Sequence, residues 1–237
     1  MAEIRQQLRS LSDWQDLRAD SGLTESVRSA VLAAVRERGY VEPITGVRRH
    51  PYQIAIRERD LHETISCCGL NGRKRALLAQ IEMELHSRQM FSPGTLRLLG
   101  TDAMARLGLV LRGIFPLHVA AELAAADGRN GVRISMPSLP SLELSFADAA
   151  FDVFVSGESF NTAAEFKTAL PDILRLLAPG GLIIAYLPFV TAADNPGSAA
   201  WEILDSLRLS GCSDAYFTTI ASSFFGITSE GRPGPFI

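Results

Sequence analysis

The sequence predicts an α/β protein in which an open, doubly wound and mostly parallel sheet follows an N-terminal helical and irregular appendage. Beyond residue 92, short apolar runs alternate with stretches of amphipathic helical spacing. Continuous apolar runs are typical of strands buried on both faces, and helices between them indicate parallel connections. The breaker Ser-Pro-Gly at residues 92–94 separates the two patterns. We therefore predict an appendage over residues 1–92 and an α/β domain over residues 93–237.

The appendage has two stretches of helical spacing. The first forty residues are expected to be helical, with Thr24 as an N-cap and Gly39 as the helix end. A second helix is expected from Asn71 onward, after an irregular segment at residues 40–69 that proline and glycine interrupt. Apolar stripes on these two helices are formed by Val27, Val31, Leu32 and Val35, and by Leu77, Leu78, Ile81 and Leu85.

The elements of the α/β domain are expected in alternating order. Strands are predicted within residues 95–100, 117–123, 151–157 and 182–189. Helices are predicted within residues 103–115, 164–178 and 199–211. The Pro179-Gly180-Gly181 turn should end the second of these helices, because glycine permits the positive φ of a sharp reversal. Asp152 is expected to accept hydrogen bonds from backbone donors at the start of its strand.

Composition argues against several functional classes. The net charge of −3 gives no electrostatic case for nucleic acid or membrane, and the first residues lack the apolar core of a secretory signal. We expect a cytoplasmic protein. Three cysteines, two of them adjacent, predict reduced thiols. Between residues 42 and 75 seven basic residues exceed four acidic ones by three, which a solvated face or internal ion pairs explains better than a nucleic-acid surface.

Polar residues follow three of the predicted strands. In doubly wound sheets, ligands bind beyond the carboxyl ends of the strands, where the chain order reverses. A residue such as Glu122, about twenty residues after the first strand end, can accept hydrogen bonds from two ribose hydroxyls, although a solvated carboxylate explains it equally well. The residues at the three strand ends are Gly100, Thr101 and Asp102, then Glu122, then Ser156, Gly157 and Glu158.

Two motifs carry a family resemblance. LSFADAAFDVFVSGES at residues 144–159 and ILRLLAPGGLIIAYLPF at residues 173–189 resemble the second half of a class I S-adenosylmethionine-dependent methyltransferase, over roughly residues 95–216. The resemblance implies a seven-stranded, Rossmann-like sheet and S-adenosylmethionine as cofactor. It also implies methyl transfer. We expect a small-molecule or carbohydrate acceptor, because the sequence has no aromatic or basic signature for a nucleobase substrate, and Glu158 is the candidate catalytic base. The cofactor-binding residues that it implies are Gly100, Thr101, Asp102, Glu122, Ser156 and Gly157.

The appendage resembles a module that precedes some of these methyltransferases, in which two Cys-x-x-Cys pairs lie upstream of Gly-Leu-Asn-x-Arg-x-Arg-Ala, here residues 69–76. The four cysteine positions would fall at Val41, Ile44, Ile65 and Cys68, so one cysteine remains. A structural zinc ion needs four nitrogen or sulfur ligands. We therefore predict no zinc and expect the module to pack through apolar side chains.

The cofactor loop also departs from the family pattern. Residues 98–104 contain one glycine, with Ala103 and Met104 where further glycines are expected, and Pro140 offers no acceptor to an adenine ring. Asn161-Thr162 stands where many relatives have Glu-His. A second hypothesis is therefore a catalytically inactive methyltransferase-fold protein that serves as a structural or regulatory subunit. The expected partners are a small-molecule acceptor or a protein chain, in a homo- or hetero-oligomer, with the last strand short or paired by a partner.

Overall fold

The computed structural model describes residues 3–19, 21–57, 65–101, 105–120, 122–124, 133–135, 146–157, 159–160, 162–187 and 198–228. The chain divides into two compact units, one formed by Met1–Glu84 with Val190–Ile237 and the other by Leu85–Phe189. The C-terminal segment thus groups with the N-terminal segment, an arrangement that the predicted division at residue 92 did not include.

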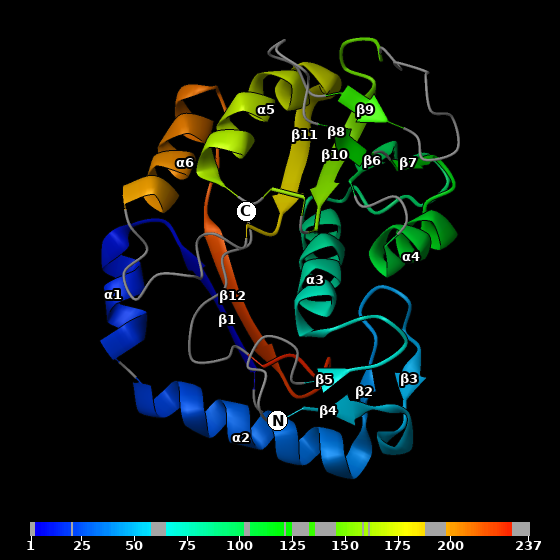
Figure 1. Cartoon of the computed structure of the whole chain (residues 1–237), viewed down its shortest axis with the longest axis vertical. Coiled ribbons are helices and arrows are strands. Elements are labelled where there is room, and N and C mark those ends of the chain that lie inside the picture. The colour runs from blue at the N-terminus through cyan, green and yellow to red at the C-terminus, as the bar shows by residue number, and fades with distance from the viewer. Residues whose placement is uncertain are drawn as a thin grey trace. The chain divides into compact units, whose positions relative to one another are not determined.

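The unit Leu85–Phe189 contains a parallel sheet of four strands. Its order is β11 (Leu177–Ala185), β10 (Phe151–Ser156), β6 (Leu98–Gly100) and β7 (His118–Ala120). Helix α4 (Arg106–Ile114) connects β6 to β7, and α5 (Ala163–Leu176) connects β10 to β11 (Figure 1). Strands β8 (Glu122–Ala124) and β9 (Arg133–Ser135) form a separate antiparallel pair. The expected α/β class with parallel strands is confirmed for these four strands.

Burial explains why β10 forms the centre of this sheet. Phe151, Val153, Phe154 and Val155 are all at most 4% exposed, as expected of a strand covered on both faces. The following helix begins where Thr162 caps it by accepting a hydrogen bond from the Glu165 N–H at 3.2 Å. Gly180 has the positive φ predicted for the turn, at 79°. Strand β11 begins earlier than predicted, at Leu177, and so includes the Pro-Gly-Gly turn. Its register with β10 shifts between Phe151 and Val153.

The starts of β6 and β10 are joined by an ion pair. Asp152 accepts hydrogen bonds from the Arg97 N–H at 2.9 Å and from the Arg97 guanidinium at 2.6 and 3.2 Å. The guanidinium also donates to the Ala149 carbonyl at 3.1 Å. These bonds to Arg97 hold the pKa of Asp152 below its ordinary value. The expected role of Asp152 as an acceptor for backbone donors is confirmed.

The other unit contains most of the helices. Its elements are β1 (Glu3–Leu8), α1 (Leu11–Ala19), α2 (Ser21–Arg38), β2 (Tyr40–Val41), β3 (Arg48–Arg49), η1 (Pro51–Gln53), β4 (Ala55–Ile56), β5 (Ile65–Ser66), α6 (Ser198–Leu209) and β12 (Phe217–Ser222), with α3 (Gly72–Ser87) running to its boundary. Strands β2 and β3 pair, as do β4 and β5. None of the helices in the described ranges is long and apolar enough to cross a bilayer.

One expectation about the chain ends is wrong. The first forty residues are not helical throughout, because residues 3–8 form β1, whose side chains are mostly exposed. Strand β12 pairs antiparallel with β1 over six residues, from Glu3 opposite Ser222 to Leu8 opposite Phe217. This pairing joins residues more than two hundred positions apart, which local spacing does not reveal. The expectation that the last strand is short or paired by a partner chain stays a prediction, since residues 229–237 lie outside the described residues.

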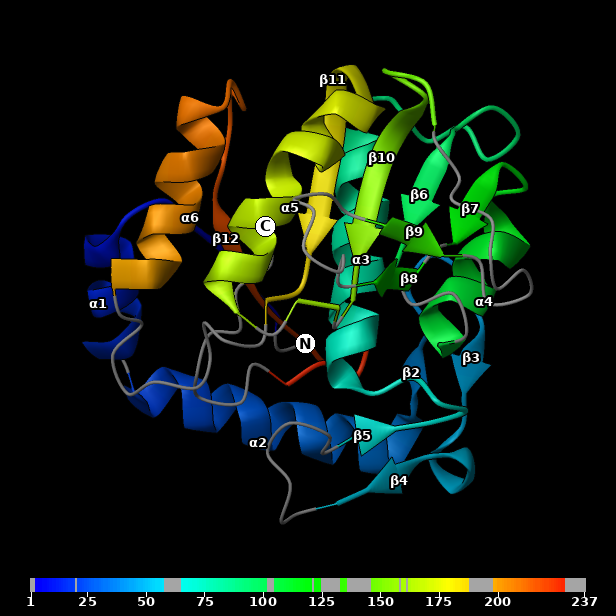
Figure 2. The ribbon, with the colours of Figure 1, turned by 45° about the horizontal axis from the view of Figure 1, so that its top comes forward.

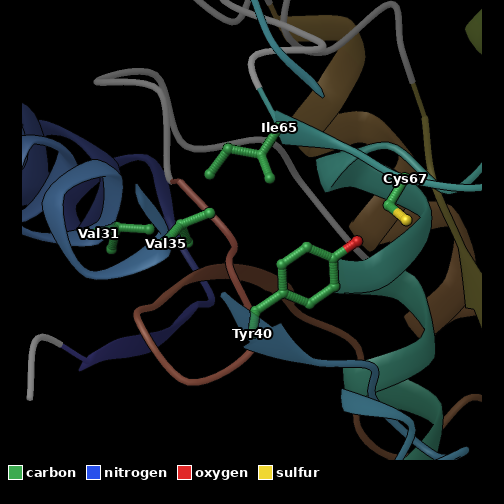
Figure 3. Close-up of a cluster of buried hydrophobic side chains, with 5 residues drawn as sticks. All are labelled: Val31, Val35, Tyr40, Ile65 and Cys67. Atoms are coloured by element: carbon green, nitrogen blue, oxygen red, sulfur yellow. The ribbon is translucent and has the colours of Figure 1, made fainter. Parts of the chain in front are cut away.

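The apolar stripe of α2 is confirmed by a buried cluster. Val31 and Val35 pack with Tyr40, Ile65 and Cys67 (Figure 3). The helix starts at Ser21, ahead of the predicted cap, and Gly39 ends it with φ 73° and an N–H donated to the Val35 carbonyl at 3.0 Å. Ile65 occupies one of the positions where a zinc ligand would be expected and is 1% exposed. Packing through apolar side chains is thus confirmed there.

Arg75 lies fully buried in this unit and ties its segments together. Its guanidinium donates to the carbonyls of Leu70 at 2.9 Å and Ile65 at 3.0 Å, and to the Tyr40 hydroxyl at 3.3 Å. It also donates to two carbonyls that follow β12, at 3.2 and 2.6 Å, belonging to Phe225 and Gly226. The Tyr40 ring lies 4.3 Å from the guanidinium carbon. Burial lowers the pKa of Arg75 and raises that of Tyr40 to about 12.

Replacing Arg75 by methionine should unfold this unit or weaken it severely. The change removes the Arg75 donor from four carbonyls, of which that of Leu70 keeps the Cys67 N–H, and each buried acceptor left unsatisfied costs about 1–3 kcal/mol. We expect the free energy of unfolding in urea to fall by at least about 3 kcal/mol. Arg73→Met, on the same helix at a half-buried position, is the matched control and should cost far less. Equal losses for the two variants would contradict the assigned role of Arg75.

Candidate functional site

The carboxyl edge of the parallel sheet is the candidate site. From β6 the chain moves to β7 on one side and later returns to β10 on the other, so the connections reverse direction between β6 and β10. Ligands of open α/β sheets bind at such a switch point. All four strands end in small residues at this edge. Gly100 pairs with Ala120, and Ser156, one residue beyond the Val155 partner of Gly100, pairs with Ala185.

Two of the predicted cofactor residues meet at the switch point. The Thr101 hydroxyl lies 3.0 Å from the Ser156 hydroxyl, and both side chains are buried, at 4% and 0% exposure. The Thr101 N–H donates to the Val155 carbonyl at 2.9 Å, which extends the strand pairing by one residue. The Tyr186 N–H donates to the Ser156 carbonyl at 2.8 Å. The hydroxyl pair thus supports the edge from within the sheet, beside Gly157, which is also buried.

Gly100 is required by a histidine that sequence reasoning missed. A Cβ atom at Gly100 would lie 2.5 Å from Nε2 of His118, so any side chain there must displace the imidazole. Residues 117–123 were interpreted only as an apolar strand, and His118 received no role. A polar residue at the start of a run predicted to be buried was the signal that could have identified it.

The environment of His118 keeps its imidazole neutral. The side chain is 7% exposed, and within the described part of the chain neither ring nitrogen has a hydrogen-bond partner. Burial, and secondarily the charge of Arg112, lowers its pKa to about 4. At neutral pH, His118 therefore carries no charge and is a poor proton acceptor.

The acidic residues predicted for this site are not placed. Asp102 and Glu158 lie outside the described residues, as do Ala103, Met104, Pro140 and Asn161. Glu122 begins β8 and pairs with Ser135, two positions beyond the end of β7, but its side chain is outside what the structure describes. The structure thus brings together Gly100, Thr101, Ser156 and Gly157 from the predicted set. Among the described residues, no three His, Cys, Asp or Glu side chains group as a metal site would require.

Gly100→Ala should destabilise the protein through its clash with His118. Forcing extra volume into a packed interior costs about 1–3 kcal/mol, and a 2.5 Å approach requires the buried ring to move. We expect a loss of that size in urea unfolding. In a His118→Ala background the same glycine substitution should cost markedly less, since the ring is gone. A cost that is unchanged in the double variant would place the constraint elsewhere.

The depressed pKa of His118 predicts a pH-dependent stability. Between about pH 6.5, its ordinary pKa, and about pH 4, the unfolded state binds a proton that the folded state does not. Stability should therefore fall as the pH drops through this window, by at most about 3 kcal/mol. Urea unfolding at several pH values should show a shallower slope for His118→Leu than for the natural chain. Parallel slopes would show that the imidazole titrates normally.

One comparison with known proteins finds a match. A family model described as a methyltransferase domain matches residues 98–185. No curated protein and no solved structure matches the chain. The matched stretch runs from the first residue of β6 to the last residue of β11, and so spans the four-stranded parallel sheet. The match supports the relationship to S-adenosylmethionine-dependent methyltransferases that the sequence motifs indicate.

Proposed function

We propose that the protein binds S-adenosylmethionine at the carboxyl edge of β6 and β10 and transfers its methyl group to a small-molecule or carbohydrate acceptor. The observation that carries the proposal is the switch point itself. There Thr101 and Ser156 share a hydrogen bond, and the four strands end in small residues, inside the stretch that matches a methyltransferase domain. We further propose that the complete sheet is of the seven-stranded, doubly wound type.

The residues at this edge suit the proposed cofactor in size and in position. Small residues at Ser156 and Gly157 would allow a ligand to approach the backbone at the end of β10, whereas the space at Gly100 is taken by His118. Asp102 would bind the cofactor's ammonium group and Glu122 its ribose hydroxyls. When bound, the cofactor supplies an electrophilic methyl group on a sulfonium. The chain's own contribution is to hold that group in line with the acceptor, because methyl transfer depends chiefly on positioning.

Proton removal from the acceptor would depend on a carboxylate. Glu158 follows the end of β10 by two residues, and a carboxylate there can accept a proton from an acceptor hydroxyl. His118 is unsuited to the task, since burial lowers its pKa to about 4. Thr101 and Ser156 have the supporting role: their hydrogen bond holds the two strand ends from which the proposed ligand-binding residues follow.

A second candidate is a catalytically inactive methyltransferase-fold protein that acts as a structural or regulatory subunit of a partner chain. One observation favours it: packing within the protein accounts for residue types that cofactor binding would otherwise account for. The absence of a side chain at Gly100 makes room for His118, and the Thr101 and Ser156 hydroxyls bond to each other. Neither feature requires a ligand.

Calorimetric titration with S-adenosylmethionine and with S-adenosylhomocysteine distinguishes the two candidates. The enzyme candidate predicts micromolar binding that weakens at least about tenfold, or about 1.4 kcal/mol, in Asp102→Ala and in Glu122→Ala. Asp205→Ala, which removes an exposed carboxylate paired with Arg208 on α6, is the control and should bind as the natural chain does. No heat at millimolar ligand, from protein shown to be folded, would contradict cofactor binding and favour the subunit.

A further inference from the structure

A tight turn in the unit that contains Met1–Glu84 places two cysteine thiols in contact. Cys67 and Leu70 exchange backbone hydrogen bonds at 3.2 and 2.9 Å, with Cys68 and Gly69 between them at φ values of 53° and 80°. Two successive positive φ values are typical of a type I′ turn. This conformation is unfavourable by about 1–2 kcal/mol for a residue with a side chain. It sets the sulfur atoms of Cys67 and Cys68 3.2 Å apart.

The two thiols differ in access to solvent. Cys68 is exposed, whereas Cys67 is 4% exposed and belongs to the buried cluster with Tyr40 and Ile65 (Figure 3). Burial, followed by the hydrogen bond with Cys68, raises the pKa of the Cys67 thiol. A reagent from solvent therefore meets Cys68 first, while Cys67 stays protonated directly beneath it.

The pair lies in a surface pocket that two cationic side chains also line. The two cysteines line a surface pocket of about 330 Å³ together with Ser66, Asn71, Arg57 and Lys74. Helix α3 begins beside this pocket, where the Asn71 side chain accepts a hydrogen bond from the Lys74 N–H at 3.0 Å. Two cationic side chains and the positive end of a helix stabilise negative charge. An accessible thiol in such a setting, next to a second thiol, has the features of a redox-reactive cysteine.

We propose that Cys67 and Cys68 form a modification site that reacts with hydroperoxides. The Cys68 thiolate attacks the terminal oxygen of the hydroperoxide, the O–O bond breaks, and the released alkoxide or hydroxide takes a proton from water. Cys68 is then a sulfenic acid. Cys67 attacks the Cys68 sulfur, the S–S bond forms, and the hydroxyl leaves as water with the proton of the Cys67 thiol. The two thiols lose two electrons, and the hydroperoxide gains them.

The disulfide formed in this way is labile. Adjacent Cα atoms lie about 3.8 Å apart, below the range of about 4.4–6.8 Å in which disulfides are usually unstrained. Strained disulfides are easily reduced. The expectation that adjacent cysteines provide no stabilising crosslink therefore agrees with a reversible role. The occupant of the site is a small oxidant, and a thiol reductant reverses the modification.

Peptide mapping of the full chain after brief treatment with hydrogen peroxide tests the proposal. We expect the peptide that contains Cys67 and Cys68 to lose two hydrogens, reversibly with dithiothreitol. The Cys67→Ser variant should instead retain a sulfenic acid on Cys68, trapped by dimedone. Cys212 is the internal control, because it is half-buried and burial raises its pKa. In the double variant Arg57→Gln, Lys74→Gln, the rate at Cys68 should fall by about tenfold or more.

Three outcomes would overturn the proposal. One is oxidation of Cys212 as fast as that of Cys68 in the natural chain. Another is a disulfide only between separate molecules. The third is a rate at Cys68 no higher than that of free cysteine. All three are measured on the natural chain, so they stay decisive even if Cys67→Ser, which alters a buried residue, fails to fold.

Discussion

Two side-chain pairs hold β6 in register with β10, and the candidate site depends on that register. Arg97 pairs with Asp152 where the strands start, and Thr101 pairs with Ser156 where they end. Each pair joins residues 55 positions apart, which is also the separation of the strand partners Leu98 and Val153. A slip of one residue would break both pairs and turn apolar side chains to the wrong face. The pairs thus fix which residues arrive together at the carboxyl edge (Figure 2).

In the other unit, the buried guanidinium of Arg75 holds several chain segments together, as a crosslink could. The segments at Tyr40, Ile65 and Leu70 are short and irregular, and strands of two residues contribute little pairing energy of their own. Arg75 supplies rigid, planar donors to the Tyr40 hydroxyl and to the Ile65 and Leu70 carbonyls, and its charge-assisted hydrogen bonds are stronger than neutral ones. The nearby Arg49–Glu42 ion pair, at 2.7 Å, has the same effect on β3. Arg49 and Arg75, two of the seven basic residues between positions 42 and 75, are thus parts of the interior framework.

Local pattern predicted the elements whose stability is local. Strand β10, helix α5 and helix α3 follow from apolar runs, a capping residue and a stripe, and the structure has all three. The β1–β12 pairing could not be predicted, since β1 reads EIRQQL and its partner lies at the far end of the chain. For the basic residues between positions 42 and 75, Arg75 among them, the sequence leaves a solvated face and internal ion pairs open, because burial depends on segments distant in sequence. His118 was missed for the same reason, since its contact with Gly100 depends on the pairing of β6 with β7.

Gly100 shows why glycine content alone does not decide whether the cofactor is used. A glycine that admits a ligand leaves space toward the ligand, whereas the missing side chain of Gly100 leaves space toward His118, within the protein. Its presence is therefore no sign of a surviving cofactor loop. For the same reason, the small number of glycines in residues 98–104 does not show that the cofactor loop has been lost. The ligand-specific groups that we propose at this edge are carboxylates, so in that proposal cofactor use depends on Asp102 and Glu122 rather than on glycine.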